Sequence, residues 1–75
     1  MWNCIIAHES RGNPSAVNSS SGAGGLFQFL PSSWAAYGGL AYASRAEYAS
    51  VGAQWAVAEH AQAVSGWSPW RGDGC

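Results

Sequence analysis

The sequence predicts a small, mainly α-helical domain of three to four helices, with a long loop or short hairpin after the first helix and one disulfide. Three observations support this fold class. Apolar residues recur at helical spacing near both ends, a Gly-, Ser- and Asn-rich stretch follows the first helix, and one cysteine lies near each end. At 75 residues the chain is one domain whose modest core needs extra support.

A first helix is predicted over residues 2–10. At roughly 100° per residue, one face carries Trp2, Ile5, Ile6 and Glu9. Water is scarce beside such a stripe, and desolvation favours the protonated form of a carboxylic acid. An acid that keeps its proton near neutral pH can donate it to a leaving oxygen. Glu9 is therefore the candidate catalytic residue, and the alternative from geometry alone is a solvated acid at a helix end.

The middle of the chain alternates between loop and helix signals. Residues 11–25 are rich in Gly, Ser, Asn and Pro and predict a long loop, a feature that is often functional in small domains. The apolar run at residues 26–30 fits either a strand or the entry into a helix. Pro31 suits the first turn of a second helix, which is predicted to end where Gly38 follows Tyr37.

The longest helix is expected to begin at Ser44, with Glu47 completing a capping box, and to run to about Ser65 before stopping at Gly66. Its apolar residues fall on two sides, so we expect burial on both. Gly52 inside this helix predicts a close helix contact, because glycine costs about 1 kcal/mol relative to alanine there.

The two cysteines, Cys4 and Cys75, lie near the two ends of the chain. A disulfide between them would close almost the whole chain into a loop and contribute roughly 4 kcal/mol. The alternatives are two free thiols or a metal site without enough partners, since His8 and His60 do not stand at metal-ligand spacing. A disulfide implies an oxidising compartment. No signal peptide is visible, so Met1 is expected to start a domain taken from a longer protein.

Composition excludes several classes of partner. Only 9% of residues are charged, the formal net charge is −1, and three arginines and no lysines are present. Tight nucleic-acid binding needs several cations on phosphates, and an electrostatic membrane anchor has the same requirement. No apolar run is long enough to span a bilayer. A neutral, aromatic-rich chain suits an uncharged ligand, and carbohydrate is the obvious candidate.

Aromatic side chains divide between the core and a possible ligand surface. Trp34, Trp55 and Tyr48 are expected in the core. Trp67 and Trp70 are candidates to stack on sugar rings, although core packing is favoured for both.

Several fragments stand together in a fixed order. They are Glu9-Ser10, Gly12-Asn13-Pro14, Ala16-Val17, Ser21-Gly22-Ala23-Gly24, Gly25-Leu26-Phe27-Gln28 and Pro31-Ser32-Ser33-Trp34. This set resembles the lysozyme-like lytic transglycosylase family of the soluble-lytic-transglycosylase type. The second half is similar to the resuscitation-promoting-factor domain, with Gln54, Ala56 to Glu59, Gly66-Trp67 and Trp70 before a terminal cysteine. The resemblance spans nearly the whole chain.

The resemblance implies an activity and a set of site residues. Such domains cleave the β-1,4 bond between N-acetylmuramic acid and N-acetylglucosamine in peptidoglycan and leave a 1,6-anhydro product. Glu9 matches their catalytic general acid and base. Gln28 matches a substrate-contacting amide, and Ser33 stands where a threonine is usual. Ser10 matches the serine after the acid, which orients the turn and stands with the substrate-binding residues.

The chain also departs from the family pattern. It lacks the Ala-Tyr-Asn motif of the soluble enzymes, and Ser65 stands where a glutamine precedes the final Gly-Trp in resuscitation factors. A hydrolase generally needs a second carboxylate about 5–10 Å from the first. The candidates Glu47, Glu59 and Asp73 belong to no recognisable motif of that kind. A mechanism that uses one acid and a nucleophile within the substrate therefore suits the acidic residues of this chain better. We expect neither a metal nor a cofactor.

The leading prediction is a monomeric lytic transglycosylase domain, residues 1–75 of a larger chain, which acts on peptidoglycan glycan strands. The alternative is a non-catalytic glycan-binding module in a secreted or phage tail protein. The expected location is accordingly extracellular at the cell wall, or virion-associated.

Overall fold

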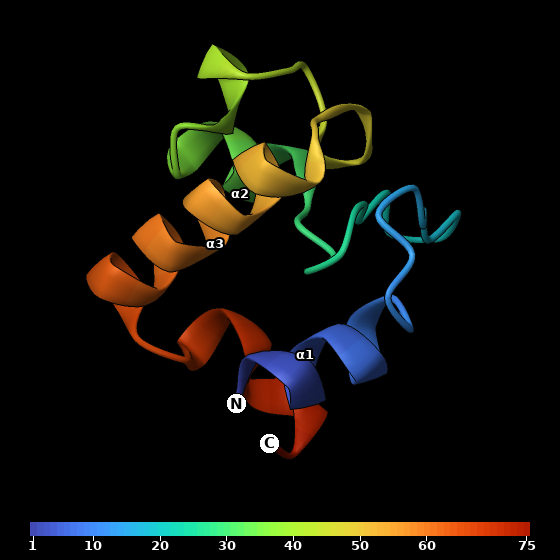
Figure 1. The fold of residues 1–75 in the computed structure, drawn as a ribbon, viewed down its shortest axis with the longest axis vertical. Helices are drawn as coiled ribbons and strands as arrows, with labels where there is room; N and C mark the ends of the chain where they lie inside the picture. The colour runs from blue at the N-terminus through green and yellow to red at the C-terminus, as the bar shows by residue number, and fades with distance from the viewer.

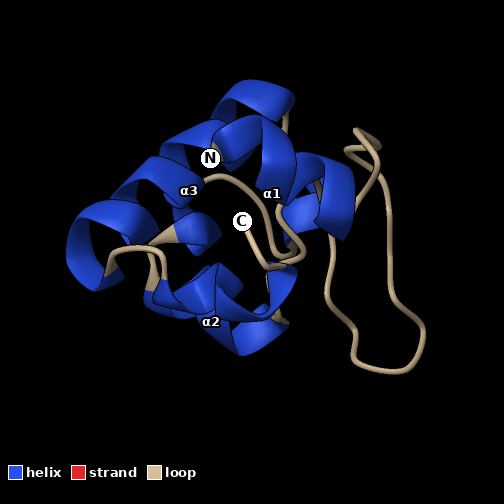
Figure 2. Cartoon of the chain, turned by 90° about the horizontal axis from the view of Figure 1, so that it is seen from below, coloured by secondary structure: helices blue, strands red, loops and turns tan.

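Three α-helices and three short 3-10 helices make up the computed structural model, which describes residues 1–75 (Figure 1). The α-helices are α1 (Trp2–Glu9), α2 (Pro31–Ala36) and α3 (Val51–Ser65). The 3-10 helices are η1 (Gly39–Ala41), η2 (Ala46–Tyr48) and η3 (Ser68–Asp73). No strand forms (Figure 2), and isolated antiparallel bridges join Val17 to Gly24 and Gly24 to Phe29. The predicted mainly α-helical fold, with a long loop after the first helix, is confirmed.

The two ends of the chain lie side by side. Cys4 on α1 and Cys75 form a disulfide across a sequence separation of 71, with their Cα atoms 6.0 Å apart. α1 packs against η3, and both termini lie at the same side of the molecule in Figure 1. The predicted disulfide is thus confirmed. Its chain-entropy contribution, about 4 kcal/mol, is large for so small a domain.

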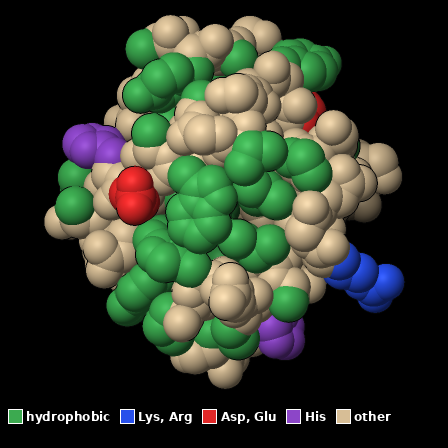
Figure 3. All heavy atoms as spheres, viewed as in Figure 1, with side chains coloured by type: hydrophobic (Ala, Val, Ile, Leu, Met, Phe, Trp, Pro, Cys, Tyr) green, Lys and Arg blue, Asp and Glu red, His purple; other side chains and the backbone are tan.

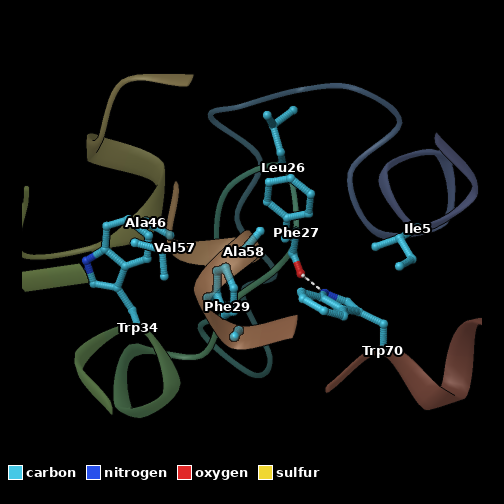
Figure 4. Packing of buried hydrophobic residues seen from close by; sticks show 10 residues of the cluster. Ile5, Leu26, Phe27, Phe29, Trp34, Ala46, Val57, Ala58 and Trp70 are labelled. Carbon is cyan, nitrogen blue, oxygen red and sulfur yellow. Dashed lines mark hydrogen bonds between the residues drawn. The ribbon is translucent and has the colours of Figure 1, made fainter. Parts of the chain in front are cut away.

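An aromatic cluster joins α1, α3 and η3. The ring of Trp2 meets four others edge to face, with centroids 4.9–5.5 Å apart: Phe27, Trp55, Trp67 and Trp70. Trp70 is also fixed by a hydrogen bond, because its indole N–H donates to the Phe27 carbonyl at 3.1 Å (Figure 4). Edge-to-face pairs add roughly 0.5–1.5 kcal/mol each beyond the apolar area that they bury. This cluster therefore holds the last short helix against the first.

Gln54 is a buried hydrogen-bonding centre that ties α3 to the loop. Its side chain is 1% exposed. The Oε1 atom accepts from the Leu26 N–H at 2.7 Å, and Nε2 donates to the carbonyls of Pro14 and Ala49, both at 3.1 Å. Gly25 lies against it with φ +82°, and a Cβ at that position would stand 2.5 Å from Gln54 Oε1. Glycine is therefore required where the loop meets the helix.

The predicted start of the longest helix is wrong. α3 begins at Val51, where the Ser50 hydroxyl accepts from the Ala53 N–H at 3.1 Å and caps the helix. The chain before it is extended at Ala49, with ψ 156°, so a helix from Ser44 cannot continue into α3. The predicted end is right, since the helix stops at Ser65 before Gly66.

Glu47 has a different role from the predicted capping box. Its carboxylate forms an ion pair with Arg45, whose guanidinium also donates to the Gly22 carbonyl at 2.6 Å. The carboxylate fills the space over Gly24, where a Cβ would stand 1.9 Å from Glu47 Oε1. The pair thus fastens the glycine-rich loop to η2.

Three packing predictions for this region are also wrong. Tyr48, expected in the core, is 69% exposed on η2. Gly52 is exposed in the first turn of α3, and a Cβ added there would meet no atom within 4 Å, so it marks no close contact. α3 is buried along one stripe rather than two, and the buried residues are Gln54, Val57, Ala58 and Ala61. By contrast, Trp34 is fully buried as expected (Figure 4).

Gln54→Leu is predicted to lower the free energy of unfolding by about 3 kcal/mol, because it leaves buried backbone groups of the loop without partners. Urea denaturation followed by tryptophan fluorescence measures the change. The matched control is Gln62→Leu, the same substitution at a half-buried position of α3, which is expected to cost under about 0.5 kcal/mol. Equal losses in the two variants would contradict a special role for Gln54.

Candidate active site

The turn after α1 fixes the chain beside Glu9. Ser10 is buried; its hydroxyl donates to the Ile6 carbonyl at 3.3 Å and accepts from the Gly12 N–H at 3.2 Å. Arg11 and Gly12 both have positive φ, 55° and 81°, which turns the backbone sharply away from the helix axis. Ser10 therefore shapes this turn, and a contact between Ser10 and a substrate stays a prediction.

Glu9 ends α1 in a half-buried position. Burial raises the pKa of its carboxyl group from the ordinary 4.5 to about 7, and a hydrogen bond with the Asp73 side chain and the charge of Asp73 act in the same direction. The surrounding protein excludes water, and this loss of solvation disfavours the ionised form of Glu9. A second carboxylate nearby adds like-charge repulsion. Near neutral pH the group can therefore both donate a proton and take one back.

Asp73, which the sequence analysis assigned to no recognisable carboxylate motif, lies beside Glu9. It lies at the end of η3, and its side chain is within hydrogen-bonding reach of Glu9 although the two stand near opposite ends of the sequence. A signal was present: Asp73 stands two residues before Cys75, and the disulfide partner Cys4 stands on the helix that ends in Glu9. Spacing alone did not reveal it, because the tail has no periodic pattern.

A hollow of about 330 Å³ opens between η3, α2 and the segment before α2. Three predicted substrate-binding residues, Gln28, Ser33 and Trp70, line it together with Tyr37. Its volume lies at the low end of small-molecule sites, which span roughly 300–1,000 Å³. Glu9 does not line this hollow; it contacts Asp73, which belongs to the same short helix as the wall residues Trp70 and Arg71.

Gln28 is held in an unusual backbone conformation at the edge of the hollow. Its φ is 54°, in the left-handed region that a non-glycine residue adopts only when the surroundings enforce it. The Nε2 atom donates to the carbonyls of Ala16 at 3.2 Å and Gly25 at 3.0 Å. Both amide hydrogens are therefore used within the protein, and the Oε1 atom is the one that remains to accept from a ligand.

The two C-terminal tryptophans are packed in the aromatic cluster. Trp70 lines the hollow but is only 4% exposed, whereas Trp67 is half-buried against Trp2 and Trp70. Sugar stacking on either ring stays a prediction. Ser65, which replaces a family glutamine, is engaged by Tyr37, since the two hydroxyls are 2.9 Å apart.

One set of possible metal ligands comes together, namely Cys4, His8 and Cys75, whose ligand atoms lie within 4.8 Å of one another. Both sulfurs are consumed in the disulfide, so His8 is the only free donor of the three. Charged side chains are few and scattered on the face shown in Figure 3. None of the helices combines the length and apolar character needed to cross a bilayer.

The sequence model of the transglycosylase-like domain matches residues 1–72. The chain belongs to the transglycosylase-like domain family. The expected resemblance is thus confirmed over almost the full length.

Resuscitation-promoting factors are similar to this member of the family. The chain is 41% identical over 70 residues to Rpf2 of Corynebacterium glutamicum. The aligned residues cover 93% of this chain and 18% of the relative. It is 44% identical over 69 residues to Rpf1 of the same organism, covering 92% of this chain and 35% of the relative. It is 38% identical over 69 residues to RpfB of Mycolicibacterium smegmatis, and the aligned residues cover 92% of this chain and 19% of the relative. The chain thus spans between 18% and 35% of the length of these proteins.

The raised pKa of Glu9 predicts a pH-dependent stability. Because the folded-state pKa lies above the ordinary value, the contribution of Glu9 is fully present below pH 4.5 and is lost as pH rises through about 7. We expect the wild type to lose stability relative to Glu9→Gln across this interval. Urea denaturation of both proteins at a series of pH values measures the difference.

Glu59→Gln is the control for this titration, because Glu59 is exposed on α3 and the substitution is the same. Its stability should follow that of the wild type from pH 4.5 to 7. A constant difference between wild type and Glu9→Gln over the same interval would contradict a raised pKa at Glu9.

Proposed function

We propose that residues 1–75 form a lytic transglycosylase domain that cleaves the β-1,4 bond between N-acetylmuramic acid and N-acetylglucosamine in bacterial peptidoglycan. The observation that carries this proposal is the half-buried Glu9 carboxyl group, with its pKa raised to about 7, at the fixed end of α1. Membership of the transglycosylase-like domain family supports it. Glu9 is the proposed catalytic residue.

The proposed reaction uses one carboxyl group twice. Protonated Glu9 donates its proton to the glycosidic oxygen as the bond from that oxygen to C1 breaks. The Glu9 carboxylate then takes the proton from the 6-hydroxyl of the muramic acid residue, and O6 bonds to C1. Glu9 ends protonated, the leaving sugar ends as an alcohol, and the product is the 1,6-anhydro sugar.

The positions of the other acids favour this route over hydrolysis. Glycosidases that use two carboxyl groups hold them about 5–10 Å apart, with room for a sugar carbon or a water between them. Asp73 instead contacts Glu9 directly. Glu47 is paired with Arg45, and Glu59 is exposed on α3. An internal nucleophile on the substrate therefore suits the site.

The protein surface suits glycan strands as the partner. The formal net charge is −1, and the face in Figure 3 is mostly polar or apolar rather than charged. Gln28 Oε1, Ser33 and Ser10 are the proposed polar contacts, and Trp67 and Trp70 the proposed aromatic ones. No cofactor, nucleic acid or membrane takes part in the proposed reaction.

We also propose the setting in which the domain works. It is a monomeric part of a larger chain, consistent with the fraction of the relatives that it spans. The disulfide suits an oxidising compartment, so the proposed location is outside the cell at the wall. The matched resuscitation-promoting factors are bacterial proteins, which favours this location over a phage tail.

A non-catalytic glycan-binding module is the second candidate function. One observation favours it: Glu9 lines neither of the two hollows, of about 330 and 460 Å³, that the surface presents. Such a module would bind muropeptide or chitooligosaccharide fragments without turnover. Tryptophan fluorescence detects binding, and mass spectrometry of the same mixture detects products.

Glu9→Gln is predicted to lower the release of muropeptides from purified cell walls by at least about 10²-fold, because the amide has no proton to donate. Mass spectrometry of wild-type products should show anhydro sugars, about 18 Da lighter than hydrolysed ones because no water is added. Glu59→Gln is the matched control and should release products at the wild-type rate. Undiminished release by Glu9→Gln would remove Glu9 from the mechanism, and binding without any products would favour the second candidate.

A further inference from the structure

Asp73 has a buried oxygen with no visible partner. The Oδ2 atom is shielded from solvent and receives no hydrogen bond from any N–H or O–H group in the chain. Buried polar atoms of this kind are rare in folded proteins, and each calls for an explanation. An ionised carboxylate only accepts hydrogen bonds, so the missing partner of Asp73 must be a donor.

The carboxyl group of Glu9 lies beside Asp73 and is a donor when it is protonated. Packing of η3 on α1 and the Cys4–Cys75 disulfide hold the Asp73 and Glu9 side chains within hydrogen-bonding reach. When Glu9 is protonated, its O–H can donate a hydrogen bond to the Asp73 carboxylate. When Glu9 loses that proton, two carboxylates face each other without a donor.

Other charged groups do not compensate the pair. The titratable groups on the surrounding elements are His8 on α1, Arg71 on η3, and Glu59 and His60 on α3, and all of them are exposed. Burial is the largest cause of the raised pKa of Glu9, and the hydrogen bond with Asp73 and the charge of Asp73 follow it. Asp73 is therefore a charged residue that acts directly on Glu9.

We propose that Asp73 is a positioning residue for Glu9: the Asp73 carboxylate accepts a hydrogen bond from the protonated Glu9 carboxyl group and keeps this acid neutral and oriented until a glycosidic oxygen takes its proton. This inference rests on the proposed function. Asp73 does not itself react; it acts through Glu9.

The pair affects both halves of the proposed reaction. Before bond cleavage, Glu9 is held as the neutral acid with its O–H directed at Asp73. Transfer of that proton to the leaving oxygen creates a second negative charge beside Asp73. The repulsion makes the Glu9 carboxylate a stronger base, which then removes the proton of the 6-hydroxyl as O6 bonds to C1. At the end Glu9 is protonated again and the hydrogen bond to Asp73 is restored.

The direct test measures the Glu9 carboxyl group in Asp73→Asn without substrate. Carbon-13 NMR titration of the disulfide-bonded protein, labelled at glutamate, follows its pKa. We expect the value to fall below the wild-type value of about 7 and to stay above 4.5, because burial, the largest cause of the shift, remains. Glu59→Gln should leave it unchanged. An unchanged Glu9 pKa in Asp73→Asn would overturn the proposal.

The second readout is the pH dependence of kcat/KM for release from cell walls. For each pKa unit by which Glu9 falls, Asp73→Asn should lose about tenfold in rate at pH 8, because the protonated fraction falls by that factor. At pH 5 the rate should stay within about twofold of the wild type, since Glu9 is protonated in both. A loss of equal size at both pH values would show a merely structural role and overturn the proposal.

Failure of the proposed function looks different from failure of this inference. If the wild type releases no products, the proposed function fails, while the NMR titration still reports whether Asp73 controls Glu9. Should Asp73→Asn disturb the turn before Cys75, Asp73→Ser is the second variant, with an intact disulfide verified by mass spectrometry. Its expected pKa shift has the same direction.

Discussion

The contact between α1 and η3 is the constraint on which the site depends. The Cys4–Cys75 disulfide fixes it covalently, and Trp2 packs against Trp67 and Trp70 beside it. The tail after α3 has only a short 3-10 helix of its own, so its position comes from this contact rather than from local preference. As a result, an acid from the end of the chain meets an acid from its beginning. The chemistry of Glu9 is thus a property of the closed chain, not of α1 alone.

Local signals in the sequence predicted much of the fold. The apolar stripe with Glu9 describes a helix, Pro31 starts α2 with its fixed φ, and Gly66 ends α3 with φ 63°. Each signal acts within a few residues, so no tertiary information is needed to interpret it. An apolar setting of Glu9 was predictable for the same reason, and burial is the largest cause of its raised pKa.

Features that depend on distant parts of the chain were not predictable in this way. Glu47 has the right spacing for a capping box with Ser44, yet its carboxylate pairs with Arg45 over Gly24, a glycine from another loop. Tyr48 has helical spacing with Trp55 but lies outside α3 and is exposed. Asp73 meets Glu9 only because a disulfide and an aromatic cluster bring the tail back. The family resemblance did not reveal this either, since none of the fragments that carry it contains Asp73.

The disulfide has a mechanical consequence for a domain proposed to work within a polymer network. Cys4 and Cys75 stand almost at the two ends, with Cα atoms 6.0 Å apart. Tension applied between the two ends of the chain would pass along the backbone to Cys4, through the disulfide, and along the backbone beyond Cys75. The helices, the glycine-rich loop and the carboxyl pair would carry almost none of that load. A pulling force on the two ends would therefore leave the geometry between Cys4 and Cys75 unchanged.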